Sequence, residues 1–204
     1  ERLLHALRPH HVWFLDVTLV RGLLGLVEFR VAAVVDAFSR TVVAIGVAER
    51  EPTAAWMARL FQRAVRCAGQ APRHVITDRG VQFTAKSFSA RVRRAGVRQR
   101  FGAIGSPDSI ALIERMWRSM KEEIAGSALL FATQHEIEAL VGRWAVWFNG
   151  HRPHQALAGQ TPDEARAGTP TRRACRPTAP RYRLECDHLG GDPKLPVYRL
   201  GRVA

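Results

Sequence analysis

Three β-rich runs joined by short connections open the chain, and they narrow the possible folds more than any other feature. They cover residues 11–20, 26–38 and 41–49 and are rich in β-branched and aromatic residues. Connections this short join antiparallel neighbours, whereas parallel strands need a crossover of a dozen or more residues. The sequence therefore predicts an antiparallel three-stranded meander.

After the meander the pattern alternates between helix and strand. A helix is predicted between the N-cap residue Thr53 and the helix-ending Gly69. A short apolar strand (73–78), a second helix (84–96) and a fifth strand (97–101) follow. This order is typical of a ribonuclease H-like α/β fold, a five-stranded mixed sheet flanked by helices. A flavodoxin-like sheet would lack the opening meander.

Two further helices complete the predicted domain. One runs over roughly residues 109–124, and the other begins at a capping box formed by Thr133 and Glu136. We expect a lead-in over 1–10, a globular core over 11–150 and a basic extension over 151–204.

The extension differs in texture from the core. Between Arg166 and Arg183 it carries six Arg, three Pro and no acid, which is typical of a basic linker or arm. Residues 182–203 predict two short strands around the turn at Gly190 and Gly191.

The charge balance indicates a polyanionic partner. The chain has 31 Lys and Arg against 18 Asp and Glu, a formal net charge of +13 in 204 residues. An excess of this size favours nucleic acid binding. No apolar run reaches the roughly 20 residues of a membrane helix, so we expect no membrane partner. The three cysteines lie far apart, which fits a reducing cytosol better than a disulfide framework: Cys67, Cys175 and Cys186.

Three isolated carboxylates stand on predicted core elements. Asp16 lies within the first strand, Asp78 ends the fourth, and Glu114 borders the apolar stripe of the helix over 109–124. Each has an ordinary explanation: a solvated strand residue, a turn residue before glycine, or a surface pair with Arg118. Together they match the oxygen ligands that Mg²⁺ prefers, and two such ions can activate and stabilise the oxygens of a phosphodiester. We interpret them as a catalytic, metal-binding set.

The motifs around these carboxylates resemble a known family. The stretches WFLDVT, VVDAFSRTVVA, ITDRGVQFTAKSF, GSPDSIALIERMWRSMKEE and FNGHRPHQALAGQTPDEA occur in order over roughly residues 10–166. They resemble the integrase core of retroviral-integrase-like DDE transposases of bacterial insertion sequences. Thirty-five residues separate Asp78 from Glu114. The hairpin match assigns Asp36 to a turn and leaves it outside the metal site.

The resemblance implies an activity and residue roles. A DDE enzyme hydrolyses a DNA phosphodiester and then transfers the freed strand to target DNA. Asp16, Asp78 and Glu114 would hold two Mg²⁺ (or Mn²⁺) ions. Lys121 matches a position that contacts DNA near the scissile phosphate. The remaining predicted DNA contacts are Arg115, Arg118, Arg152 and His154.

The resemblance also implies partners. DNA would be bound both as element ends and as target, by a homo-oligomer in the bacterial cytoplasm at the nucleoid. Relatives usually carry a helix-turn-helix module ahead of the core, and the sequence predicts none before His11. A truncated gene, a trimmed sequence and a separate recognition module are the explanations left open. Many relatives also have Asn four residues before the glutamate, often after Asp, where this chain has Ser109 and Ile110. Substrate contacts there are therefore expected to differ.

Two other functions remain open from the sequence. A ribonuclease H-like nuclease would cut without joining, although the 35-residue spacing and the RPHQAL stretch argue against it. A degenerate or domesticated relative would bind DNA without catalysis, and the change at Ile110 motivates this alternative.

Overall fold

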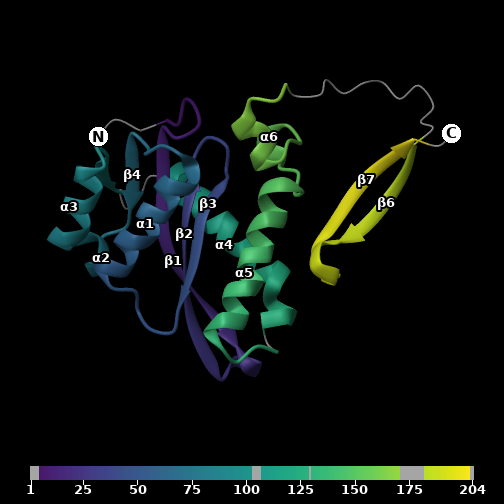
Figure 1. Ribbon diagram of the computed structural model, residues 1–204, viewed down its shortest axis with the longest axis horizontal. Coiled ribbons are helices and arrows are strands. Elements are labelled where there is room, and N and C mark those ends of the chain that lie inside the picture. The colour runs from purple at the N-terminus through teal and green to yellow at the C-terminus, as the bar shows by residue number, and fades with distance from the viewer. Residues whose placement is uncertain (1–4, 103–106, 129, 171–181, 203–204) are drawn as a thin grey trace.

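Five strands form one mixed sheet, as predicted from the sequence. The computed structural model describes residues 5–102, 107–128, 130–170 and 182–202. The strands of the sheet are β1 (Val12–Gly22), β2 (Val27–Asp36), β3 (Val42–Ala48), β4 (His74–Thr77) and β5 (Arg98–Phe101). β1, β2 and β3 pair antiparallel, while β1, β4 and β5 run parallel, in the order β3-β2-β1-β4-β5 (Figure 1). β1 therefore lies at the centre of the sheet.

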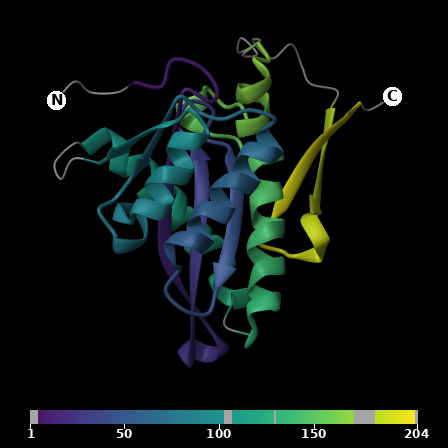
Figure 2. The same ribbon diagram turned by 60° about the vertical axis from the view of Figure 1, so that its left-hand side comes forward.

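Helices cover both faces of this sheet. They are α1 (Ala54–Ala68), α2 (Val81–Thr84), α3 (Lys86–Arg94), α4 (Pro107–Ala128), α5 (Gln134–Gly150) and α6 (Pro162–Ala167). α1 and α3 pack on the sheet face that carries Trp13, where Phe61 of α1 is buried. α4 and α5 pack on the face that carries Phe14, where Trp144 of α5 is buried (Figure 2). Trp13 and Phe14 face opposite ways because side chains alternate along a strand.

Local signals placed most helix ends correctly. Thr53 caps α1, Gly69 ends it in the left-handed conformation, and Thr133 forms the predicted capping box with Glu136. Two helices were not predicted. α2 is a single turn, too short to show a period, and α6 begins with a second capping box at Thr161 that lies in a turn-rich stretch.

Asp36 is a structural residue, as its place in the hairpin indicated. It is buried, and its Oδ1 accepts hydrogen bonds from the N–H groups of Phe38 and Ser39 and from the Ser39 hydroxyl. Its Oδ2 accepts from the N–H of His10 at 2.6 Å. A buried carboxylate needs such partners, and here they join the β2–β3 turn to the segment that leads into β1.

The stretch FNGHRPH ties the end of α5 to the sheet. The side-chain Oδ1 of Asn149 accepts from the N–H of Val42 at 2.8 Å, and its Nδ2 donates to the carbonyl of Val42 at 2.9 Å. The Thr41 hydroxyl donates to the carbonyl of Pro162 at the start of α6. The first part of the predicted extension therefore packs on the core.

The C-terminal strands predicted around Gly190 and Gly191 form an antiparallel hairpin. They are β6 (Tyr182–His188) and β7 (Pro196–Arg202). Leu195 is buried in the α4–α5 cluster, and the indole of Trp147 on α5 donates to the carbonyl of Pro196. The basic arm predicted over 166–183 falls mostly outside the described residues. Within those residues, no helix has the length and apolar character needed to cross a bilayer.

The two hydrogen bonds between Asn149 and Val42 should contribute measurably to the free energy of unfolding. Asn149→Ala leaves the N–H and C=O of Val42 without their partners, so we expect a loss of about 1–3 kcal/mol of unfolding free energy in urea titrations. Gln70→Ala, at an exposed loop position, serves as control. A loss below about 0.5 kcal/mol, the usual range for surface substitutions, would contradict this role.

Candidate active site

Strand register brings Asp16 and Asp78 together. Phe14 on β1 pairs with Ile76 on β4 in a parallel ladder. Continuing this register by two residues places Asp16 opposite Asp78, at the point where β4 ends. By alternation both side chains lie on the face of Phe14 and Ile76, which is the face that α4 covers. Two carboxylates predicted from separate elements are thus neighbours.

Helix α4 brings the third carboxylate to the same face. The indole Nε1 of Trp117 on α4 donates to Oδ2 of Asp16 at 2.8 Å. Glu114 lies three residues earlier on the helix, less than one turn away, and its side chain is exposed. The Trp117 hydrogen bond therefore fixes the part of α4 that carries Glu114 against the centre of β1. Ser109 and Ile110 have side chains outside the described set.

The three carboxylates are close enough to affect one another's charge. Burial raises the pKa of Asp16, and repulsion from Asp78 and Glu114 raises it further. The hydrogen bonds from Trp117 and from the backbone at Val17 act against this rise. Ionised Asp16 therefore lowers the stability of the folded chain, as expected for a carboxylate in a site that binds a cation.

The structure can be compared with the ordinary explanations given above, a turn residue for Asp78 and a surface pair with Arg118 for Glu114. Oδ1 of Asp78 accepts from the N–H of Gly80 at 2.9 Å, so this carboxylate does stabilise a turn. No hydrogen bond to the other oxygen, Oδ2, is present among the described residues. Glu114 and Arg118 form no ion pair within the described side chains. The pairing explanation for Glu114 is thus not supported.

The donor set fits a hard divalent cation. All three side chains offer carboxylate oxygens, the ligands that Mg²⁺ and Mn²⁺ accept. Over the described part of the chain, however, no three Asp, Glu, His or Cys side chains already stand as a closed metal cluster. Glu114 is exposed, and exposed side chains change rotamer within nanoseconds, so its carboxylate is free to reorient.

The basic residues predicted to contact DNA lie at different positions around α4. Lys121 is about two helical turns after Glu114, so both project from the same flank, and Arg118 lies close to them. Arg115 lies about 100° around the helix from Glu114, toward the side where Ser119 contacts the segment that follows α5. Lys121 and Arg118 are therefore the basic residues of α4 that lie closest to the direction of Glu114, and Arg115 lies further round the helix.

Arg152 and His154 belong to a network on the side of α4 that carries Ser119 and Glu123. Nε of Arg152 donates to Glu123 at 2.9 Å, and its guanidinium lies 5.7 Å from the centre of the Phe148 ring. The His154 ring meets Phe148 edge-on, with centroids 4.6 Å apart. These contacts hold the segment after α5 on the core, so both residues have a structural role whether or not they meet DNA.

A further basic residue, Arg40 in the β2–β3 turn, lies beside this network. Burial lowers the pKa of His154 to about 4, and repulsion from Arg152 and Arg40 adds to the shift, so the imidazole is neutral at pH 7. Nε2 of His154 and Nε of Arg40 are buried without a partner in the described residues. Nothing in the sequence singled out Arg40 or Trp117, because their importance arises only from contacts across the fold.

Comparison with known proteins agrees with this geometry. Residues 6–107 match the profile of a family described as "Integrase core domain", and residues 95–162 match a second profile of the same description. The chain belongs to the integrase core domain family. The resemblance inferred from the motifs is therefore confirmed, and the two matches together span the three carboxylates.

Insertion sequence proteins are among the relatives of this integrase core. It is 31% identical over 180 residues to a putative transposase for insertion sequence element IS986/IS6110 of Mycobacterium tuberculosis (strain CDC 1551 / Oshkosh). It is 24% identical over 165 residues to a transposase for IS904 of Lactococcus lactis subsp. lactis (strain IL1403). These matches cover 84% and 80% of this chain. The chain spans only 62% and 64% of the length of these relatives.

Solved structures confirm the predicted fold. The integrase core aligns with the HTLV-2 integrase catalytic core domain in complex with magnesium, with a TM-score of 0.61 and 19% identity. The alignment covers 79% of this chain and 99% of that domain. A simian T-cell lymphotropic virus intasome chain aligns with a TM-score of 0.64 and 20% identity, over 97% of this chain and 69% of that one. The ribonuclease H-like α/β architecture is thus shared.

The raised pKa of Asp16 predicts a stability difference that depends on pH. Ionised Asp16 costs stability above its folded-state pKa, and protonation removes that cost below the unfolded-state pKa. In metal-free buffer, Asp16→Asn should therefore be more stable than wild type at neutral pH. The advantage should shrink as the pH falls toward about 4.

Urea unfolding at several pH values measures this difference. Glu122→Gln, at an exposed position on the same helix, is the matched control and should show little change. If Asp16→Asn is less stable than wild type at neutral pH, the Trp117 hydrogen bond outweighs the burial cost and the charge argument is wrong.

Proposed function

We propose that this chain is the catalytic core of a DDE transposase or integrase. It would carry out metal-dependent hydrolysis of a DNA phosphodiester followed by strand transfer, as in DNA integration and recombination. The proposal is supported most by the β1–β4 register, which would set Asp16 opposite Asp78 if continued two residues past Phe14 and Ile76, and by the Trp117 hydrogen bond, which holds the Glu114 part of α4 beside β1. Family membership supports the same reaction class.

The three carboxylates would share the metal ions. Asp16, Asp78 and Glu114 would hold Mg²⁺ or Mn²⁺, two ions in all. When bound, such ions lower the pKa of an attacking water and stabilise charge on the leaving oxygen. Trp117 keeps one oxygen of Asp16 in place, and the Gly80 N–H does the same for Asp78. These donors orient the carboxylates before a cation arrives.

Basic residues near the carboxylates would position the DNA. Lys121 and Arg118, on the flank of Glu114, would bind phosphates close to the reacting one. Arg115, with Arg152, His154 and the newly found Arg40, would bind DNA toward the side of α4 that carries Ser119 and Glu123. Contacts of this kind supply non-specific affinity and weaken steeply with salt.

The wider assembly follows from the same proposal. The core would act on element ends and on target DNA as a homo-oligomer, in the bacterial cytoplasm at the nucleoid. Sequence recognition would come from a separate helix-turn-helix module. The HTLV-2 core domain aligned above is described as a dimeric form and the simian virus chain as part of an intasome, which supports oligomeric action without assigning a subunit number to this chain.

The alternative that the sequence left open is a non-catalytic DNA-binding relative. Such a protein would bind DNA equally well with and without a divalent ion, and it would neither nick nor join it.

Plasmid nicking separates these functions. We expect the chain to nick or join supercoiled plasmid in Mn²⁺ or Mg²⁺, with no reaction in EDTA. Glu114→Gln should lower the rate by at least about 100-fold, since a ligand to the ions is lost while the exposed site tolerates the change. Gel separation of supercoiled, nicked and joined forms gives the measurement.

The control variant for this assay is Glu122→Gln, which removes an equal charge from an exposed position on α4 about two turns beyond Glu114. It should retain the wild-type rate. Equal activity of the Glu114→Gln variant and wild type would remove Glu114 from the catalytic set. Nicking without joined products would instead favour the nuclease alternative.

A further inference from the structure

Strand β5 presents two arginines on the same face of the sheet as the carboxylates. Gln99 hydrogen-bonds to Ser89 and to the carbonyl of Phe83, so it points to the α3 face. Its neighbours Arg98 and Arg100 therefore point to the opposite face, where Asp16 lies. Both arginines are exposed. Their placement on this face follows from register and is not evident from composition.

These arginines continue a line of side chains that begins at Asp78. Arg100 pairs with Ile76 and Arg98 with His74 in the parallel β4–β5 ladder. From Asp78 toward the start of β4 and β5, the exposed charged side chains on this face are therefore Arg100 and then Arg98. β4 and β5 contain no acidic residue, since their sequences are HVIT and RQRF.

His74 adds a buried polar atom to the same line. Its side chain is 4% exposed, and its Nδ1 has no partner in the described residues. Its ring lies edge-on to His11, with centroids 5.7 Å apart. Burial lowers the pKa of His74, and Arg100 is the charged neighbour that adds most to this shift. The histidine is therefore neutral at pH 7 and can donate one ring N–H without adding to the charge repulsion.

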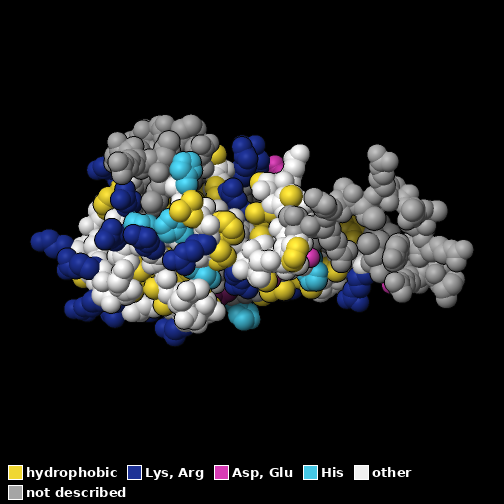
Figure 3. Space-filling model, turned by 90° about the horizontal axis from the view of Figure 1, so that it is seen from above, with side chains coloured by type: hydrophobic (Ala, Val, Ile, Leu, Met, Phe, Trp, Pro, Cys, Tyr) yellow, Lys and Arg dark blue, Asp and Glu magenta, His cyan; other side chains and the backbone are white. Residues whose placement is uncertain are grey.

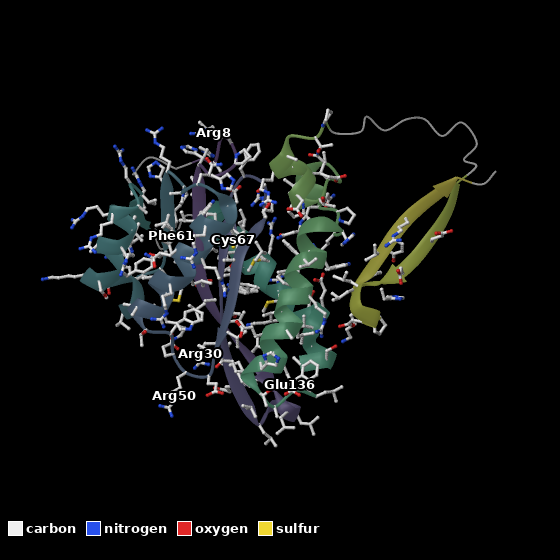
Figure 4. The ribbon with its side chains drawn as sticks, viewed as in Figure 1. Arg8, Arg30, Arg50, Phe61, Cys67 and Glu136 are labelled. Carbon is white, nitrogen blue, oxygen red and sulfur yellow. The ribbon has the colours of Figure 1, made fainter. Side chains whose placement is uncertain are left out.

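Four arginines elsewhere in the described chain do form ion pairs with acids: Arg21, Arg30, Arg152 and Arg166. Arg30, at the lower end of the molecule, bonds to Glu51 and Glu28 (Figure 4). No ion pair of the described residues involves β4 or β5. A view from above shows Lys, Arg and His gathered over the half that carries α3, with few acids (Figure 3). Among the described residues, no acid therefore pairs with the positive charges of β5.

We propose that Arg98 and Arg100 form a phosphate-binding strip, beside the buried His74 that pairs with Arg98, and that this strip guides the DNA backbone away from the carboxylates across the open edge of the sheet. Exposed guanidinium groups on a rigid strand suit phosphate oxygens, which they bind through paired N–H donors. The strip is distinct from the basic residues of α4. It rests on the proposed function in one respect, namely that the polyanion at the carboxylates is DNA.

The length of the strip sets its reach along the DNA. Residues 74–78 span about 13 Å at about 3.3 Å per residue. One DNA strand rises about 3.4 Å per nucleotide along the helix axis, so a strip parallel to that axis would span about four nucleotides from the reacting phosphate.

The salt dependence of DNA binding tests the strip. The slope of log affinity against log salt becomes shallower by about 0.9 for each phosphate that the protein no longer neutralises. The double variant Arg98→Gln, Arg100→Gln should therefore lower the slope by about two for a short DNA duplex in EDTA. Each single variant should lower it by about one, which keeps the test valid if the pair does not fold.

A matched control separates specific contacts from general charge. Arg93→Gln, Arg94→Gln removes the same charge from exposed positions on α3, on the other side of the sheet. It should change the slope by less than half as much. An unchanged slope in the β5 variants, or an equal loss in the α3 pair, would overturn the strip.

Failure of the strip and failure of the proposed function give different results. Metal-dependent plasmid nicking with no slope change in the β5 variants keeps the transposase and removes the strip. A reduced slope in the β5 variants without nicking by wild type keeps the strip on a DNA-binding protein that does not catalyse.

Discussion

The hydrogen bond from Trp117 to Asp16 joins helix α4 to the centre of the sheet, and the grouping of the three carboxylates depends on it. Strand pairing alone can align Asp16 with Asp78, because both lie on parallel neighbours. A helix has no such ladder to set its position along a strand. The 2.8 Å bond from the indole, together with burial of Trp117, holds the middle of α4 beside β1 and so carries Glu114 to the site.

This arrangement trades stability for chemistry. Burial and like charge both disfavour ionised Asp16, and a fold selected for stability alone would place an amide or an apolar residue there. Asp36 shows the contrast within the same sheet, since its carboxylate is fully buried but accepts four hydrogen bonds. The carboxylates of the candidate site instead keep oxygens available, as a site for cations requires.

The fold could be predicted from the sequence, and the three carboxylates could be selected as a candidate site, because each depends on local signals or on motif order. Strand alternation, the caps at Thr53 and Thr133, and the spacing of Asp78 and Glu114 are all readable along the chain. The sequence could not predict that Trp117 donates to Asp16, because the two residues lie 101 positions apart. The apolar neighbours of Trp117 on the helix explain its burial equally well. The sequence also did not predict how the basic residues divide around α4 or which face of the sheet carries Arg98 and Arg100, because both depend on strand register and packing.

Selective relaxation of the Trp117 indole by Mn²⁺ tests most directly that Asp16, Asp78 and Glu114 share a metal site. In ¹⁵N-labelled protein, substoichiometric Mn²⁺ should broaden the indole N–H signal of Trp117 first, because that N–H donates to Asp16. The indoles of Trp144 and Trp147, which donate to Glu123 and Pro196, should stay sharp, and Asp78→Asn should remove the difference. Uniform broadening, or earlier loss of the Trp144 signal, would contradict a metal site at these three carboxylates.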